Sequence, residues 1–166
     1  MVTRERILVD GMNLIYKFPD LAFFLGEYRL QEARTGLLQK LNQFYQNKKN
    51  REILVFFDGK KDLISDCYSE VRDGLSIHYS HEKKADELII GYLSQSPIPA
   101  QCLVVTSDKE IISFARRIRA KRITSEEFYS EWKKAEELDD ETDFMKMKEG
   151  LTSTSDEDYW ERQFLS

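Results

Sequence analysis

The sequence predicts an α/β fold of three layers, in which helices cover both faces of a mostly parallel central sheet. Short runs of apolar residues make up most of 7–9, 52–57 and 101–106, the pattern of strands buried on both faces. Segments with helical spacing separate these runs, as crossover helices separate parallel strands. A chain of 166 residues without a visible internal repeat fits one main domain with a real core.

The first half of the chain predicts two buried strands. The strand at 7–9 ends at Asp10, and Gly11 then permits a sharp turn. The segments 14–18 and 21–26 are predicted as short helical or irregular pieces over the strand ends. Apolar residues at helical spacing predict a long helix over 30–45. The second strand, 52–57, ends at Asp58, so the opening pattern recurs.

The second half predicts three more strands. The polar stretch 60–73 is expected to be a loop with a weak helical turn, and the alternating residues 75–79 a strand nearer a sheet edge. A further buried strand at 101–106 leads to Asp108, and a short strand is expected at 119–123. Capping and breaking residues predict the helices that alternate with these strands, at 85–93, 109–117 and 125 to about 136.

Acidic charge is concentrated near the C-terminus. Residues 133–166 hold five basic and eleven acidic residues, which leaves 20 basic and 19 acidic residues in 1–132. The body is therefore nearly neutral, and the net charge of −5 does not exclude a nucleic-acid partner. We predict one folded domain over 1–136 and, over 137–166, an acidic linker with a short C-terminal helix that starts near Ser155.

Composition also bounds the location. No apolar run approaches the roughly 20 residues of a membrane span, and the N-terminal residues have no apolar signal core. Cys67 and Cys102 share no metal-binding or disulfide spacing and are expected to be free thiols. We therefore expect a cytoplasmic protein without a membrane partner. The sequence does not indicate an oligomeric state.

Acidic residues recur where the predicted strands end. Asp10, Asp58 and Asp108 follow strands, and Asp86 opens a helix with Glu87 beside it. The carboxyl ends of parallel strands share one sheet edge, so these carboxylates should converge. Like charges in one cleft repel unless a cation neutralises them, and all-oxygen ligands suit Mg²⁺ or Mn²⁺. Such ions promote phosphodiester hydrolysis.

Each acid also has a purely structural interpretation. Asp10 and Asn13, or Ser107 and Asp108, could simply cap the following helices. Asp86 could complement a helix dipole, and Asp-Gly after a strand is a common turn, which makes Asp58 the weakest candidate ligand. The recurrence of acids at three strand ends and one helix start favours the metal site over separate caps.

Four short motifs in order carry a resemblance to a known family. They are Val9-Asp10-Gly11-Met12-Asn13, Phe56-Phe57-Asp58-Gly59, Ala85-Asp86-Glu87-Leu88-Ile89 and Val104-Val105-Thr106-Ser107-Asp108. The series resembles the NYN domain family of PIN-like ribonucleases and is most similar to its bacterial YacP-like branch, with residues 79–84 also similar to that branch. The similarity covers roughly residues 6–132. Met12 departs from the aromatic residue expected there, and nothing transfers to the acidic tail.

The resemblance implies a PIN-like α/β/α fold and cleavage of single-stranded RNA, with mRNA on the ribosome as a candidate substrate. It implies Mg²⁺ or Mn²⁺ at Asp10, Asp86 and Asp108. Asn13 matches the Asn that follows the first acid, where it would orient a ligand, water or phosphate. Arg34 falls where the branch tends to carry an Arg, and it would face the scissile phosphate.

Basic and aromatic residues supply candidate RNA contacts. Lys60, Lys61, Lys83 and Lys84 lie in loops at the predicted active edge and could contact phosphates. The basic group at 116–122 follows a helix and more simply complements its dipole. His81 is a candidate acid or base, although a solvated loop histidine is the simpler interpretation. Phe23, Phe24 and Tyr28 could stack on bases but are more simply apolar cover.

Two alternatives to an endoribonuclease stay open on the sequence. The first is a noncatalytic RNA- or ribosome-binding module on the same fold. The predicted acids count against this module, because clustered carboxylates would repel the phosphates of a bound RNA. The second is a Mg²⁺-dependent phosphatase of the haloacid dehalogenase type. That family requires a second Asp two residues after the first, and position 12 is Met.

Overall fold

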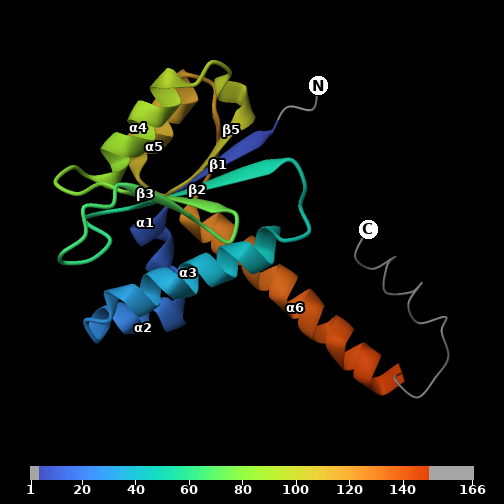
Figure 1. Cartoon of the computed structure of the whole chain (residues 1–166). Helices are drawn as coiled ribbons and strands as arrows, with labels where there is room; N and C mark the ends of the chain where they lie inside the picture. The colour runs from blue at the N-terminus through green and yellow to red at the C-terminus, as the bar shows by residue number, and fades with distance from the viewer. Residues whose placement is uncertain (1–3, 150–166) are drawn as a thin grey trace. The chain divides into compact units, whose positions relative to one another are not determined.

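A six-stranded sheet forms the centre of the computed structural model, which describes residues 4–149 (Figure 1). The strands lie in the order β3-β4-β2-β1-β5-β6, and all neighbours are parallel except β3 and β4. This arrangement confirms the predicted α/β fold with a mostly parallel sheet. The strand bounds are Glu5–Asp10 (β1), Arg51–Phe57 (β2), Ser69–Arg72 (β3), Leu75–Tyr79 (β4), Cys102–Val105 (β5) and Lys121–Ile123 (β6).

Helices cover both faces of the sheet. Figure 1 shows α4 and α5 on one face, with α1, α2 and α3 on the other. The first residues of α6 belong to the second layer, because Phe128 packs its ring 5.0 Å from that of Phe44 in α3. The helix bounds are Gly11–Ile15 (α1), Pro19–Gly26 (α2), Leu30–Tyr45 (α3), Ala85–Gln95 (α4), Lys109–Arg117 (α5) and Ser125–Glu149 (α6), with a 3₁₀ turn at Pro99–Gln101.

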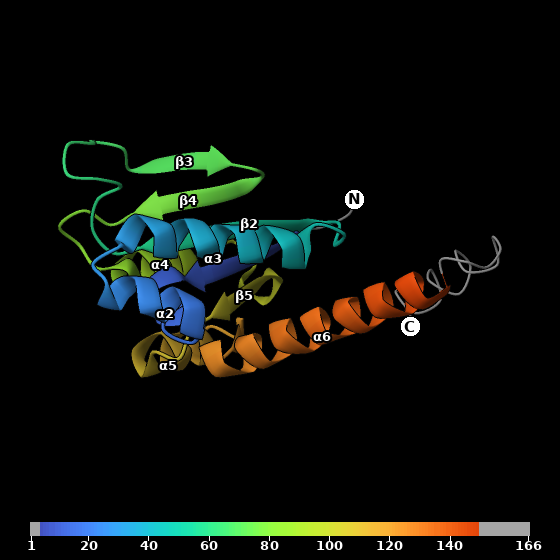
Figure 2. The same cartoon turned by 90° about the horizontal axis from the view of Figure 1, so that it is seen from below.

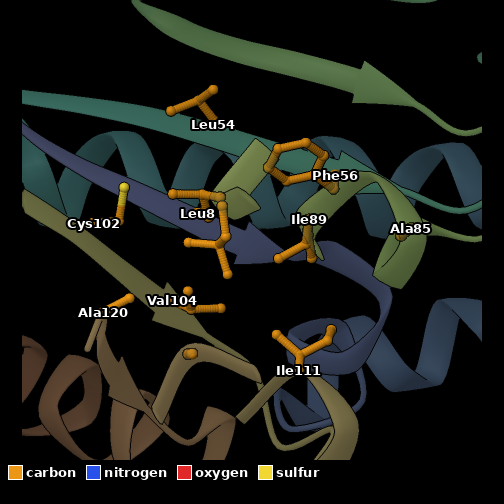
Figure 3. Close-up of a cluster of buried hydrophobic side chains, with 11 residues drawn as sticks. Leu8, Leu54, Phe56, Ala85, Ile89, Cys102, Val104, Ile111 and Ala120 are labelled. Carbon is orange, nitrogen blue, oxygen red and sulfur yellow. The ribbon is translucent and has the colours of Figure 1, made fainter. Parts of the chain in front are cut away.

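The central strand β1 explains why the apolar runs are continuous. Leu8 pairs in register with Leu54 of β2 and Val104 of β5, and all three side chains pack beneath α4 and α5 (Figure 3). Ile7 and Val9, which alternate with Leu8 along the strand, are also almost fully buried. A strand covered on both faces needs apolar residues at every position, so its sequence shows no alternation.

Two elements differ from the sequence-based expectation. The stretch 60–73 contains an edge strand, β3, antiparallel to β4, so β4 is one strand in from the edge. The sequence of β3 shows no alternation of buried apolar and exposed polar residues, because most of the strand is exposed. Its half-buried residue, Glu70, forms ion pairs with Lys61 and Arg72. Helix α6 continues to Glu149 rather than ending near Glu136, so much of the predicted linker is helical.

The chain divides into two compact units, one up to Tyr129 and one from Ser130 onward. The predicted domain boundary at 136/137 stays a prediction. The short C-terminal helix expected from about Ser155 lies outside the described residues. Within 4–149, no helix combines the length and the apolar character needed to cross a membrane.

Candidate active site

Three acids follow neighbouring strands at the carboxyl edge of the sheet. Asp10 is the last residue of β1, Asp58 comes directly after β2, and Asp108 follows β5 by three residues. Because β1 lies between β2 and β5, Asp10 is the middle acid. The negative charges of Asp58 and Asp108 both act on Asp10 and raise the pKa of its carboxyl. The predicted convergence of these three acids therefore exists in the fold.

Asp10 is a buried carboxyl whose pKa is strongly raised. Its side chain is only 8% exposed, and burial, followed by the Asp58 and Asp108 charges, raises its pKa to about 6. One oxygen, Oδ2, accepts a hydrogen bond of 2.9 Å from the Thr106 hydroxyl, which lowers the pKa and offsets part of the rise. Asp10 occupies the N-cap position of α1, where its side chain makes no regular capping hydrogen bond, although the backbone N–H of Asn13 in the first turn also lowers its pKa. Helix capping is therefore only a minor role of this acid.

Asp58 and Asp108, in contrast, do cap helices. Asp108 Oδ1 accepts from the backbone N–H groups of Glu110 and Ile111 at the start of α5. Asp58 Oδ1 accepts at 2.7 Å from the N–H of Ala85, the first residue of α4. Each carboxylate uses one oxygen in this way and retains a second. The structural and the ligand interpretations of these two acids are therefore compatible.

Asp86 is in a different local setting. It is half-buried in the first turn of α4, directly after the residue that Asp58 caps, and its Oδ1 accepts from the Glu87 N–H. Its charge is not among the main contributions to the raised pKa of Asp10. The structure thus couples Asp10 with Asp58 and Asp108 electrostatically, whereas the part of Asp86 in the site stays a prediction. Glu87 is exposed.

Asn13 joins three segments of the chain at this edge. Its Oδ1 accepts hydrogen bonds from the Ser107 N–H at 2.9 Å and from the Ser125 hydroxyl at 2.6 Å. These contacts tie α1 to the end of β5 and to the start of α6. With Oδ1 engaged twice, the amide NH₂ is the group that Asn13 has left to offer, and this group is a donor rather than a metal ligand.

Sequence reasoning missed the hydroxyl residues that hold the acids in place. Thr106 is fully buried, donates to Asp10, and accepts at 3.0 Å from the N–H of Asp108. Ser107 accepts at 3.0 Å from the Ser125 N–H and donates to Glu126. Lys17 and Ser107 together lower the Glu126 pKa to about 2. The sequence feature that could have indicated this role is Thr106 itself, which ends an apolar strand directly before Ser107 and Asp108.

Arg34 is buried below the loop that carries Asp58. Only 3% of it is exposed, and its guanidinium donates to the backbone carbonyls of Asp58 (2.6 Å), Lys60 (2.8 Å) and Lys61 (3.3 Å). The group also lies over the rings of Phe57 and Tyr79. Burial lowers the pKa of Arg34. These contacts leave little of the guanidinium for the direct phosphate contact that the sequence suggested.

The predicted lysines lie in the loops beside these acids. Lys60, Lys83 and Lys84 are exposed. Lys61 is half-buried, and its Nζ lies 2.6 Å from Glu70, an ion pair that raises the pKa of the lysine. The structure thus leaves three of the four lysines in solvent at the carboxyl edge of the sheet.

The donor chemistry of this edge suits a hard cation. Burial and, to a smaller extent, two neighbouring acids raise the pKa of Asp10, and a bound divalent ion would offset both effects. Among the described residues, however, no three His, Cys, Asp or Glu side chains form a ready-made ligand group. Binding at Asp10, Asp86 and Asp108 therefore stays a prediction about the loaded protein.

A parallel sheet with acids after its three central strands, and an asparagine three residues beyond the first, is the arrangement that the resemblance to the NYN domain family led us to expect. The chain matches the family described as the YacP-like NYN domain over residues 7–166, and it belongs to this family. Membership supports a nuclease-type, RNA-related function.

Two solved structures share the fold. They are Rae1 (YacP) from Bacillus subtilis and a tryptophan-to-leucine mutant of the same protein, 22% and 21% identical to this chain, with TM-scores of 0.63 and 0.68. The alignments cover 95% and 96% of this chain and 91% of each of those chains. No curated protein sequence matches.

Proposed function

We propose that the protein is a metal-dependent endoribonuclease that hydrolyses phosphodiester bonds in single-stranded RNA. The observation that carries the proposal is the buried Asp10, whose pKa is raised to about 6 between two other strand-end acids. A fold maintains such an unfavourable carboxylate where it serves a function, and perturbed pKa values cluster at functional sites. Membership in the YacP-like NYN family directs the interpretation to nuclease chemistry.

In this proposal Asp10, Asp86 and Asp108 hold Mg²⁺ or Mn²⁺, and Asp58 supports them. The ion supplies an activated water and neutralises charge on the scissile phosphate when bound. Thr106 orients Asp10 through its 2.9 Å hydrogen bond. The Asn13 amide NH₂ donates to a phosphate oxygen or water, because its Oδ1 is engaged by Ser107 and Ser125.

Arg34 has a positioning role in the proposal. Its three carbonyl acceptors lie in the loop that carries Asp58, Lys60 and Lys61, so Arg34 fixes this loop from below. The exposed side chains of Lys60, Lys83 and Lys84 contact RNA phosphates, while Lys61 is shared with Glu70. RNA binding is therefore assigned to the loops and not to the guanidinium.

The finer features of the proposal rest on the resemblance to the YacP-like branch. These are a cytoplasmic location and action on mRNA carried by the ribosome. They predict that translating ribosomes raise the cleavage rate by presenting the RNA to the enzyme.

The second candidate function is a noncatalytic RNA- or ribosome-binding module. Asp58 and Asp108 each serve as helix caps, so a fold without catalytic activity would also have a structural use for these two acids. A binding module would retain the lysines and the fold but would need no ion. Binding without cleavage is its distinguishing result.

The experiment is cleavage of labelled single-stranded RNA by the full chain, with Mn²⁺, Mg²⁺ or EDTA, in the presence and absence of translating ribosomes. The proposal expects internal cuts that require the divalent ion. Cleavage that persists in EDTA would contradict the metal dependence. Tight binding to RNA or ribosomes without cleavage under any of these conditions would establish the binding module instead.

A further inference from the structure

Tyr68 and His81 form a stacked pair that the proposed chemistry does not use. Their ring centroids lie 3.8 Å apart with an interplanar angle of 18°. Tyr68 precedes β3 and His81 follows β4, so the pair joins the two loops that flank the β3–β4 hairpin. One face of the Tyr68 ring is covered by His81, yet the residue is 66% exposed. The opposite face of an aromatic ring is therefore presented to solvent.

Several contacts hold the His81 ring of this pair in place. The His81 Nε2–H donates at 2.8 Å to the Cys67 carbonyl, which fixes the ring beneath Tyr68. The His81 backbone N–H donates at 2.9 Å to the Gly59 carbonyl, and His81 has a φ of +57°. The carbonyl of Tyr68 accepts from the Tyr79 N–H. An exposed ring on a fixed support loses little conformational entropy when it binds a flat ligand.

The pair also lies beside the strand-end acids. His81 contacts Gly59, the residue after Asp58, and Asp58 in turn caps α4 through Ala85. Figure 2 shows the loop after β2 and the loop before α4 at the same end of the sheet. The exposed lysines Lys60 and Lys83 belong to these two loops. A flat aromatic surface, positive charge and the acids therefore share one region.

We propose that the Tyr68–His81 pair is a platform for one nucleobase of single-stranded RNA. The base stacks on the open face of Tyr68, and the adjoining phosphates pass Lys60 and Lys83 on the way to the acids. Every base has an aromatic face, so such a platform positions RNA with little sequence preference. The inference deepens the proposed ribonuclease function and rests on it.

Exposed apolar side chains near Tyr68 suggest a second possible ligand, a protein partner, which the test must distinguish from RNA. Leu63, Ile64 and Val71 are 98%, 94% and 75% exposed on the same loop and on β3. A protein partner would bury these side chains together with Tyr68. RNA is favoured because a supported ring beside lysines and acids matches the alternation of base and phosphate, which isolated aliphatic side chains do not.

The test measures binding of a short single-stranded RNA by the full chain carrying Asp10→Asn, which prevents cleavage. The RNA carries 2-aminopurine at one position at a time, because stacking quenches this fluorescent base. Tyr68→Ala should raise the Kd about 5- to 100-fold and abolish quenching at one position. Tyr68→Phe retains the ring and should behave as its parent.

Two further variants separate stacking from folding and from apolar contact. Tyr68→Leu preserves apolar volume without an aromatic face and should bind as weakly as Tyr68→Ala. Val71→Ala removes an exposed apolar side chain from β3 and should leave the Kd unchanged. Unchanged binding and quenching in Tyr68→Leu, or a loss of RNA binding with Val71→Ala equal to that with Tyr68→Leu, would overturn the platform.

Failure of the platform is distinguishable from failure of the ribonuclease function. If the unsubstituted chain cuts RNA and Tyr68→Leu cuts with the same KM, only the platform is wrong. If the unsubstituted chain neither binds nor cuts RNA, the proposed function fails and the platform with it.

Discussion

Asp10 combines burial, neighbouring negative charge and a position at the centre of the sheet edge. Its pKa of about 6 exceeds the unfolded value of about 3.9. Between these two values the folded protein holds a proton that the unfolded chain has released, so stability falls as pH rises through this window. The difference between the two pKa values corresponds to roughly 3 kcal/mol of lost stability above pH 6, as an upper limit.

A neutral isostere at this position should remove this loss of stability at high pH. Asp10→Asn retains the size of the side chain but carries no charge to bury. We expect it to match the unsubstituted protein near pH 4 and to exceed its stability by roughly 1–3 kcal/mol at pH 7–8. Urea unfolding in EDTA across this pH range measures the difference.

The control for that substitution is Asp73→Asn. Asp73 lies in the β3–β4 turn, at the opposite edge of the sheet, with a φ of +52° that asparagine accepts. It should show no comparable gain at high pH. A constant difference between Asp10→Asn and the unsubstituted protein at all pH values would contradict the assignment of a raised pKa to Asp10.

At the scale of elements, the junction of β1 and α1 depends on close packing. A Cβ built on Gly11 would lie 2.5 Å from the Phe57 ring and 2.9 Å from the Phe56 carbonyl oxygen. The sequence suggested Gly11 for its conformational freedom, but its φ is not positive in this fold. The reason for glycine here is space: a side chain would push Asp10 and β2 apart.

Gly11→Ala should therefore destabilise the protein by about 1–3 kcal/mol, the usual cost of overpacking a core. Gly91→Ala is the matched substitution, because a Cβ at Gly91 in α4 meets nothing within 4 Å. It should stabilise the protein by about 0.5–1 kcal/mol through helix propensity. Thermal unfolding of both variants gives the comparison, and equal effects would refute the packing argument.

Arg34 links helix α3 to the loop after β2. Its removal leaves the carbonyls of Asp58, Lys60 and Lys61 without their donor. We expect Arg34→Met to cost about 2–4 kcal/mol and to speed amide hydrogen exchange in the 58–61 loop. Arg34→Lys should recover part of the stability only, because one ammonium cannot reach three carbonyls with fork geometry. Exchange that stays slow in Arg34→Met would show that Arg34 does not hold this loop.

Local sequence patterns predicted the elements with long apolar or periodic stretches. Helices α3 and α5 begin and end as expected, because helical spacing and flanking polar residues both mark them. Strand β3 was not predicted because an exposed edge strand need not alternate polar and apolar residues. The convergence of Asp10, Asp58 and Asp108 followed from strand parallelism alone.

Contacts between distant segments could not be predicted in the same way. The choice of Thr106 as the partner of Asp10, 96 residues away, depends on β5 lying beside β1. The burial of Arg34 depends on where the loop after β2 crosses α3. Neither leaves a periodic signal along the chain, and the phosphate contact expected of Arg34 rested on the family resemblance alone.

At the scale of the whole molecule, RNA affinity should depend on charge at one edge of the sheet only. Replacing Lys83 and Lys84 by alanine removes two exposed cations beside the acids. The slope of log Kd against log salt should fall by about 0.7 per lysine that contacts a phosphate. Fluorescence anisotropy with labelled single-stranded RNA at several salt concentrations measures this slope.

The matched double variant removes Arg116 and Arg117. Both are exposed in the last turn of α5, which starts at the active edge and runs away from it. Their loss removes the same charge from the molecule but should leave the salt slope unchanged. If both double variants lower the slope equally, RNA binds the surface diffusely and the proposed edge does not direct it.

Asp10 is proposed to be part of a catalytic centre for RNA cleavage. This role is tested by the rate at which Asp10→Asn, Asp73→Asn and the unsubstituted chain cut the same single-stranded RNA in saturating Mn²⁺. We expect Asp10→Asn to lose at least about 10²-fold in rate while remaining folded, and Asp73→Asn to cut at the unsubstituted rate. Cleavage by Asp10→Asn at the unsubstituted rate would show that Asp10 has no catalytic role.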